Sequence, residues 1–300
     1  MKALTVFTPT YNRANTLPRL YHSLLNQDRD CFKWLIVDDG SQDNTRELVT
    51  QWINEALIEI KYIYQENAGK MQAHNRGVLE CDTDLFLCCD SDDWMMENSI
   101  KKSLDYWENH KHEDLAGMIS PKKIVNGTVD NLSLFPKNED YDNLTGIYNK
   151  GYIGETAIFF RIEIVKNFLF PKIEGEKFIP ESYVYQQIDQ SYMYLLCCSY
   201  FMECEYQPDG LSNNGYLLGI RNPRGMAMAA NMSLSMLPFL KCFRAAGSLD
   251  FYSIICGQSL IDILKVANKP LICLLMYPLA FVKYLTSRNL IQSQNTKKKL

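Results

Sequence analysis

Over the first 120 residues, short uninterrupted apolar runs alternate with segments in which apolar residues recur every three or four positions. The runs predict strands, and the periodic segments predict amphipathic helices. Strands are expected at 4–8, 32–37, 57–64, 85–89 and 116–119. Helices are expected at 16–26, about 45–52, 71–79 and 94–110. This alternation predicts an α/β fold with a mostly parallel sheet and helices on both of its faces.

After residue 120 the alternation is lost, and the pattern becomes mixed α+β with longer loops. Asn126-Gly127 is a hairpin signal between two short apolar pairs. Further on, the pattern predicts a strand at 157–161, a short helix to Phe170, a helix from Glu181 to about Cys198 and a strand at 200–206. Loops of this kind are where acceptor-binding segments are expected.

The last third is helical in pattern, over 223–246 and 254–266 and in an uncharged stretch at 271–282. Twelve uncharged residues are too few to span a bilayer of about 30 Å. Lys269 and Lys283 flank the stretch, and a basic tail follows, so residues 269–300 favour peripheral contact with an anionic membrane surface. A core helix followed by a solvated tail explains the same pattern equally well.

Composition narrows the class of protein. The chain has 300 residues, of which 47 % are hydrophobic and 22 % charged, and its formal net charge is −4. No basic field points to nucleic acid, so no nucleic-acid partner is expected. The ten cysteines form no Cys-x-x-Cys pair, and no secretory signal is recognised at the N-terminus, which predicts a cytoplasmic protein with reduced thiols.

Three carboxylates follow the fourth predicted strand directly, as Asp90-Ser91-Asp92-Asp93. In open α/β sheets, ligands bind at the carboxyl ends of the strands. One interpretation is therefore a site for a divalent metal that carries a diphosphate. The other is a helix start, with Asp92 or Asp93 as the N-cap of the helix from Trp94 to His110.

The other strand ends also carry ligand-type groups. Tyr11 offers an aromatic face after the first strand, which Pro9 is expected to end, and Asp38 and Asp39 follow the second strand. Lys70 offers a cation after the third. Because parallel strands bring these ends to one edge, together they describe a nucleotide-diphosphate pocket.

The motifs Thr8-Pro9-Thr10-Tyr11-Asn12-Arg13, Val37-Asp38-Asp39-Gly40-Ser41, Asn67-Ala68-Gly69-Lys70 with His74-Asn75-Arg76-Gly77, and Asp90-Ser91-Asp92-Asp93 resemble those of family-2 glycosyltransferases with the GT-A fold. The resemblance implies that Tyr11 stacks near the base, Asp39 accepts from the uracil imide and Asp90 lies near the ribose. It also implies that Asp92, with Asp90 beside it, holds Mn²⁺ or Mg²⁺. The nucleotide-sugar-binding residues implied are Thr8, Pro9, Tyr11, Arg13, Asp38, Asp39, Asn67, Gly69, Lys70, Asn75, Asp90 and Ser91.

The segment Gly175 to Tyr183 resembles members that build bacterial surface polysaccharides, and the resemblance implies an acidic general base before a helix. Glu181 is the candidate, although Ser182 stands where the family commonly has Asp. Glu155 and Asp189 are the next candidates. Such a base implies inversion at the anomeric carbon. The processive signature Gln-x-x-Arg-Trp is absent, which favours transfer of a single sugar.

The expected function is thus transfer from a nucleotide sugar, expected to be a UDP sugar, to a glycan or lipid-linked saccharide, in the cytoplasm or peripherally on the inner face of the membrane. The expected ranges are 1–120 for the nucleotide-sugar half, 121–215 for the acceptor half and 216–300 for the helical region. A sugar-1-phosphate nucleotidyltransferase is an alternative, but it needs a glycine-rich loop, and residues 9–15 contain no glycine. The second alternative is a non-catalytic relative that binds a nucleotide sugar or a glycan.

Overall fold

The computed structural model describes residues 2–125, 130–205 and 215–297. Its contacts divide the chain into two compact units, one made of residues 1–169 and 191–207, the other of residues 170–190 and 208–300. The functional division at residues 120 and 215 stays a prediction, because these units are defined by contacts and not by ligands. The predicted hairpin at Asn126-Gly127 lies outside the described residues.

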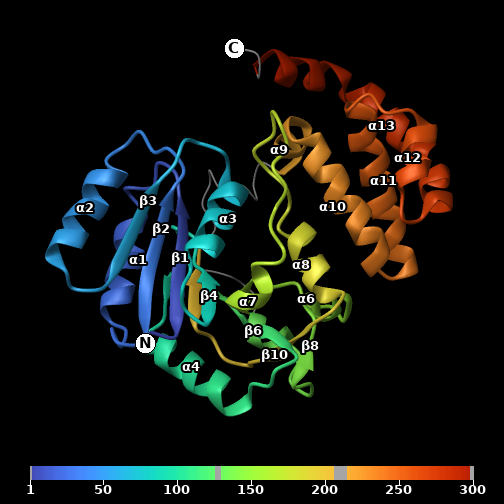
Figure 1. Cartoon of the computed structure of the whole chain (residues 1–300). Coiled ribbons are helices and arrows are strands. Elements are labelled where there is room, and N and C mark those ends of the chain that lie inside the picture. Colours follow the sequence, from blue (N-terminus) through green and yellow to red (C-terminus); the bar gives the residue numbers. More distant parts are fainter. Residues whose placement is uncertain (1, 126–129, 206–214, 298–300) are drawn as a thin grey trace. The chain divides into compact units, whose positions relative to one another are not determined.

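The first unit is built on a mixed sheet that is mostly parallel at its N-terminal side. In the described residues it has eight strands in the order β3-β2-β1-β4-β9-β6-β10-β8. Their bounds are β1 Leu4–Thr10, β2 Phe32–Asp38, β3 Ile60–Tyr64, β4 Leu85–Cys88, β6 Leu115–Pro121, β8 Tyr141–Asp142, β9 Thr156–Arg161 and β10 Met193–Leu196. Strands β1 to β4 pair in parallel, and β9 runs antiparallel to both β4 and β6. The predicted α/β architecture is confirmed (Figure 1).

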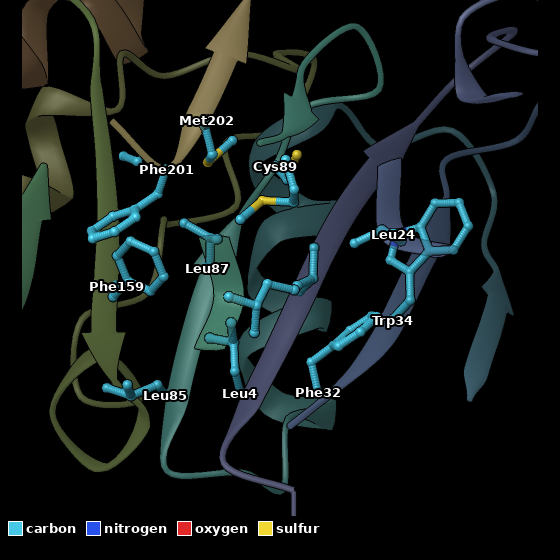
Figure 2. Packing of buried hydrophobic residues seen from close by; sticks show 14 of the residues in the cluster. Leu4, Leu24, Phe32, Trp34, Leu85, Leu87, Cys89, Phe159, Phe201 and Met202 are labelled. Atoms are coloured by element: carbon cyan, nitrogen blue, oxygen red, sulfur yellow. The ribbon is translucent and has the colours of Figure 1, made fainter. Parts of the chain in front are cut away.

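Helices cover both faces of this sheet. Their bounds are α1 Leu17–Leu25, α2 Thr45–Glu55, α3 Lys70–Glu80, α4 Ser99–His110, α5 Asn131–Leu134, α6 Leu144–Asn149 and α7 Ile162–Val165. Apolar residues of α1, α2 and α4 belong to one core cluster with alternate residues of β1, β2 and β4. Figure 2 shows side chains from β1, β2, β4 and β9 gathered there. Period-two alternation explains this selection, since successive strand residues face opposite sides.

Helix α3 covers the other face and approaches β1 closely. A Cβ atom on Gly77 would lie 2.4 Å from the ring of Phe7. His74, one turn earlier, is buried edge-on against both Phe7 and Phe86. Glycine therefore sets the distance between helix and strand at this point.

Pro9 does not end the first strand as predicted, because β1 continues to Thr10 and pairs along β2 to Asp38. Proline has no N–H to donate to the neighbouring β4. The Thr8 hydroxyl instead donates to the carbonyl oxygen of Cys89 at 2.9 Å. The side chain thus satisfies an acceptor beside the proline.

The helix predicted from Trp94 to His110 is wrong in its first turn. Trp94–Met95 forms strand β5, and α4 begins only at Ser99. Strand β5 pairs with β11 (Met202–Cys204), which also pairs with β7 (Lys123–Ile124) in a second small sheet. This long-range pairing overrides the local helical pattern, so neither Asp92 nor Asp93 caps a helix.

The helix predicted from Glu181 to about Cys198 is also too long. Helix α8 (Ser182–Asp189) ends early, and β10 then pairs with β6 and β8. Tyr194, Leu195 and Leu196 are buried in that sheet. Backbone pairing with two neighbours again outweighs the local pattern.

The second unit is helical and includes α8. Its other described helices are α9 Gly215–Arg221, α10 Pro223–Met236, α11 Phe239–Ile255, α12 Leu260–Val266 and α13 Pro270–Lys297. The helix predicted at 254–266 is divided, because Gly257 has a φ of 80° and Ser259 and Asp262 form a capping box at the start of α12. The uncharged stretch at 271–282 belongs to a helix of 28 residues. By length and composition, 25 of them, Pro270–Gln294, could cross a bilayer.

Candidate active site

The loops that follow β1, β2, β3 and β4 lie at one edge of the sheet, because the four strands are parallel. This edge collects the motif residues expected from the sequence. The carboxyl end of β6 lies at the same edge, since β6 and β4 are both antiparallel to β9. Fold topology alone therefore places carboxylates from two loops beside cations from two others.

Asp39 organises the loop that leads into α3. Its carboxylate accepts hydrogen bonds of 2.8 Å from Gln65 Nε2 and from the backbone N–H groups of Ala68 and Gly69. Its carbonyl oxygen accepts a further bond of 2.8 Å from Asn67 Nδ2. Asp39 thus holds the turn on which Lys70 stands, whatever contact it makes with a base.

Asp38 lies fully buried and is satisfied inside the protein. One carboxylate oxygen accepts from the N–H of Ser41 at 2.7 Å, and the other from the hydroxyl of Tyr62 at 2.6 Å. Burial and the Asp38 hydrogen bond both raise the pKa of Tyr62, so the phenol stays protonated and remains a donor. These contacts give Asp38 a structural role in fixing the loop after β2.

The loops after β1 and β2 are joined to each other. Asn12 donates its N–H to Ser41 Oγ at 2.8 Å and accepts from the N–H of Gln42 at 2.7 Å. Asp43 accepts from the N–H groups of Ala14 and Thr45, both at 3.1 Å. Hydrogen bonding holds the pKa of Asp43 below its ordinary value although burial opposes this. Asp43 therefore joins the loop after β1 to the start of α2.

Two glycines at this edge have backbone conformations that other residues rarely adopt. Gly40 has a φ of 86°, and a Cβ there would lie 2.9 Å from the backbone nitrogen of Asn67. Gly69 has a φ of 96° and is the N-cap of α3. Gly40 is thus favoured both by its backbone conformation and by the close approach of Asn67, and Gly69 by its backbone conformation.

The β1 motif residues separate into core and surface. Thr8 is buried, donates to Cys89 and accepts from Trp34 Nε1 at 3.0 Å, and Pro9 is buried in β1. Arg13 is partly buried, and its N–H donates to Thr45 Oγ1 at 3.2 Å. Tyr11 is 46 % exposed, which leaves its ring open to a ligand.

Asp90 is paired with the lysine at the start of α3. Lys70 Nζ lies 2.8 Å from Asp90 Oδ2. Burial opposes ionisation, but the ammonium groups of Lys70 and Lys122 hold the pKa of Asp90 below its ordinary value. Ser91 is buried after it, and Asn75 is partly buried on α3. Lys70 thus stabilises Asp90 as a carboxylate at this edge.

Lys122, which directly follows β6, was missed in the sequence. Its ammonium lies 2.6 Å from Asp93 Oδ2, and both side chains are nearly fully buried. Burial raises the pKa of Asp93 to about 6, although Lys122 opposes the shift. For Lys122, burial opposes the charge, but Asp93 and Asp90 hold its pKa well above the ordinary range. Lys122 follows the fifth predicted strand, so the strand-end argument used for the first four could have found it.

Asp92 lies between the two paired carboxylates Asp90 and Asp93. Its own carboxylate pairs with no lysine or arginine side chain among the described residues. Burial, and next the Asp90 charge, raise the pKa of Asp92, while Arg13 and Lys70 oppose the shift. Its backbone carbonyl oxygen accepts a 2.7 Å hydrogen bond from Arg19 Nη2 on α1. Arg19 in turn pairs with Glu205 at 2.7 Å and stacks on Trp94.

The residues fit a divalent cation by their chemistry. Within the described ranges, no group of three or more His, Cys, Asp or Glu side chains is arranged to hold a metal by itself. Mg²⁺, however, is commonly held by one or two carboxylates together with substrate phosphates. A cation beside Asp92 would relieve the unfavourable charge of a partly buried carboxylate next to Asp90.

The three base candidates lie in different places. Glu181 is the N-cap of α8 in the second unit, and Asp189 is buried at the end of that helix. Glu155 belongs to the first unit and immediately precedes β9. Its carbonyl oxygen accepts the N–H of Lys122 at 2.8 Å, so Glu155 lies at the same sheet edge as the aspartates. The identity of the base stays a prediction.

Comparisons with known proteins agree on the family. The model of Glycosyl transferase family 2 matches residues 5–168. The chain is 25 % identical over 177 residues to the poly(ribitol-phosphate) β-N-acetylglucosaminyltransferase TarS of Staphylococcus aureus, which is 55 % of this chain and 30 % of that protein. It is 31 % identical over 104 residues to TuaG of Bacillus subtilis, which is named for teichuronic acid biosynthesis. The match covers 34 % of this chain and 41 % of TuaG. The matched segments span less than half the length of these curated relatives.

Solved structures agree on the fold. Residues 1–349 of TarS, in complex with UDP-GlcNAc, superpose with a TM-score of 0.64 at 18 % identity, covering 99 % of this chain and 88 % of that one. A mannosyltransferase from Pyrobaculum calidifontis, in complex with GDP-Man and Mn²⁺, superposes with a TM-score of 0.55 at 16 % identity. This superposition covers 97 % of this chain and 84 % of the mannosyltransferase. With the matched family model, they show that this chain belongs to glycosyltransferase family 2, has the GT-A fold and is similar to enzymes of bacterial surface polysaccharide synthesis.

Proposed function

We propose that this chain transfers one sugar from a nucleotide sugar, a UDP sugar, to a glycan or lipid-linked saccharide, with inversion at the anomeric carbon. The observation that carries the proposal is the arrangement at the sheet edge. Asp90 and Asp93 are each paired with a lysine, and Asp92 between them has no such partner in the part of the chain that the structure describes. This leaves one partly buried carboxylate for a cationic ligand.

Asp92 is the residue that would hold the divalent ion, Mn²⁺ or Mg²⁺, with Asp90 beside it. When bound, such an ion supplies Lewis-acid stabilisation to the leaving diphosphate. The positive charges of Arg13 and Lys70 both oppose the rise in the pKa of Asp92. Cations near this carboxylate can also neutralise the oxygens of a diphosphate bound there. Two solved complexes support a nucleotide sugar and a divalent ion as ligands. They are TarS with UDP-GlcNAc and the mannosyltransferase with GDP-Man and Mn²⁺.

On the nucleotide side, the ring of Tyr11 is exposed for stacking on the base. Among the described residues, three protein groups donate to the carboxylate of Asp39, whose two oxygens can together accept about four hydrogen bonds. One acceptor position thus remains for the imide N–H of uracil. Asp39 would then both shape the turn at Gly69 and read the base.

The acceptor hydroxyl needs a group that takes its proton as it attacks. Glu181 at the start of α8 is the proposed base, and Glu155 and Asp189 are its alternatives. The carboxylate would accept the proton on the side of the sugar opposite the diphosphate, which gives inversion. Glu155 is the alternative that lies beside Lys122 at the sheet edge.

The names of two relatives support a proposal for the cellular setting. TarS is named for poly(ribitol phosphate) and TuaG for teichuronic acid biosynthesis, and we propose a bacterial surface polysaccharide as the acceptor class, with transfer in the cytoplasm at the inner face of the membrane. Residues 269–300 would provide peripheral contact. No nucleic acid takes part.

The test is a panel of nucleotide sugars with the full chain, with and without Mn²⁺, scored by release of the nucleoside diphosphate. We expect release with one donor and loss of it on chelation. Asp92→Asn should abolish release, whereas Asp114→Asn, at the opposite end of β6, should retain it. Wild-type turnover in Asp92→Asn would refute the metal assignment, and nucleotide binding without turnover under any condition would favour the non-catalytic alternative.

The base is tested separately. Glu181→Gln should lose transfer but keep the affinity for donor, while Glu47→Gln on the exposed face of α2 should match the wild type. If Glu181→Gln transfers at the wild-type rate, Glu181 is not the base. The variants Glu155→Gln and Asp189→Asn then identify the base as the carboxylate whose loss abolishes transfer.

A further inference from the structure

Helix α13 presents a continuous apolar stripe to solvent. Exposed leucine and valine side chains recur every three or four residues along it, at Leu271, Leu274, Leu275, Leu279, Val282 and Leu285. Leu271 is 75 % exposed, Leu275 66 % and Leu279 64 %. Isolated exposed leucines need no explanation, but a stripe of this length on one helix face indicates an interaction surface.

The opposite face of α13 is packed against its own unit. Ile272, Cys273 and Ala280 are buried in the same core cluster as residues of α11. Only 17 % of the most apolar part of the helix is buried, so packing within the unit leaves the stripe exposed. Figure 1 shows α13 beside α11 and α12 in this unit.

Charge around the stripe is strongly one-sided. From residue 239 onward the sequence contains nine lysines and arginines and two aspartates, although the whole chain carries −4. Of the two aspartates, Asp250 is buried and Asp262 is engaged in the capping box of α12. Lys265, Lys283 and Arg288 are exposed on α12 and α13. An apolar stripe among exposed cations is complementary to an anionic lipid surface, which attracts the cations and takes up the apolar side chains.

Polar contacts hold the second half of α13 in place. The hydroxyls of Tyr216 and Ser287 lie 2.7 Å apart, and Arg221 Nε donates to Gln294 Oε1 at 2.8 Å. Lys283 Nζ lies 4.4 Å from the centre of the Phe251 ring. A helix that crossed the bilayer would have to give up these contacts with α9 and α11, so the contacts favour a helix that stays on its unit.

We propose that the helical unit binds the surface of an anionic lipid bilayer through the stripe on α13, with the helix lying in the plane of the membrane and not crossing it. This extends the membrane contact proposed above for residues 269–300. Its test measures lipid binding and not turnover, so it can fail while the transferase proposal stands.

The experiment is co-sedimentation of the full chain with phosphatidylcholine vesicles, with and without phosphatidylglycerol. We expect binding only to the anionic vesicles, weakening as salt rises. The variant Leu275→Ser/Leu279→Ser should bind at least about tenfold more weakly, because both side chains lose their contact with the acyl region. The matched control Leu57→Ser/Leu79→Ser, at exposed leucines of the first unit, should bind as the wild type does.

Equal binding of the stripe variant and the wild type would overturn the proposal, as would equal binding to neutral and anionic vesicles. A wild type that self-associates without binding vesicles, and becomes monomeric on Leu275→Ser/Leu279→Ser, would assign the stripe to a second copy of this chain. Protein that stays in the pellet after an alkaline carbonate wash would overturn the in-plane helix in favour of a spanning one. The salt and lipid dependence of the wild type tests the proposal even if the variant fails to fold.

Discussion

The guanidinium of Arg19, on α1, donates a hydrogen bond of 2.7 Å to the backbone carbonyl oxygen of Asp92. Its other terminal nitrogen pairs with Glu205, and its Cζ atom lies 3.8 Å from the centre of the Trp94 ring. Arg19 therefore fixes the backbone of the carboxylate that we propose holds the metal, and touches it through the main chain alone. A rigid fork with several donors suits this role better than a lysine does.

Arg19→Lys should reduce turnover roughly tenfold to a hundredfold, because small displacements of a catalytic group are costly. The metal concentration that gives half-maximal activity should rise, whereas the melting temperature should change little. Arg29→Lys, at an exposed position after the same helix, is the control. A loss of turnover without any change in the metal dependence would mean that Arg19 does not act through Asp92.

Lys122 and Asp93 form a buried ion pair whose separation should be costly. Lys122→Met should lower the free energy of unfolding by about 3–5 kcal/mol, since it leaves a buried carboxylate without its partner. Lys123→Met, which breaks an exposed pair with Glu203, should cost about 1 kcal/mol or less. Urea denaturation measures both, and similar losses for the two lysines would contradict the buried pair.

Gly77 allows α3 to approach β1. Gly77→Ala should destabilise the protein by roughly 1–3 kcal/mol, because the added methyl would meet the Phe7 ring at 2.4 Å. It should also weaken donor binding, since Lys70 and Asn75 stand on the same helix. Gly215→Ala, where a Cβ would meet no atom of the described residues within 4 Å, is the matched control. An increase in stability at residue 77 would show that α3 can move away without cost.

Asp250 makes stability depend on pH. It lies fully buried on α11, and neither carboxylate oxygen accepts a hydrogen bond from a nitrogen or oxygen donor among the described residues. Burial raises its pKa to about 7, although the Cys273 thiol partly opposes the shift. The folded state therefore binds a proton more tightly than the unfolded state, so the free energy of unfolding falls as pH rises from about 4 to about 7.

Asp250→Asn removes that titration. At pH 8 the variant should be more stable than the wild type by roughly 1–3 kcal/mol, and near pH 4 the two should differ little. Thermal unfolding followed across this pH range is the measurement. Parallel pH curves for the two proteins would mean that Asp250 is not the group responsible.

The sequence determined the first half of the fold and which loops form the edge with the candidate site, because there the signals are local. Each of the first four strands is an apolar run followed at once by its polar loop, so parallel topology was enough to bring Tyr11, Asp39, Lys70 and Asp92 to one edge. The glycines at 40 and 69 mark loop conformations in the same local way.

Only the tertiary structure decided the features that depend on partners far apart in the chain. Trp94 became a strand because residues 202–203 pair with it, and β10 replaced the end of a predicted helix because β6 and β8 flank it. Asp93 was assigned to a cap by its neighbours in sequence, but it binds Lys122 across the sheet edge. The sequence of α13 is apolar on several sides of the helix, and packing against α11 decided that Ile272, Cys273 and Ala280 are buried while the leucines face solvent. Long-range pairing and burial override local propensity because they involve more free energy than it does.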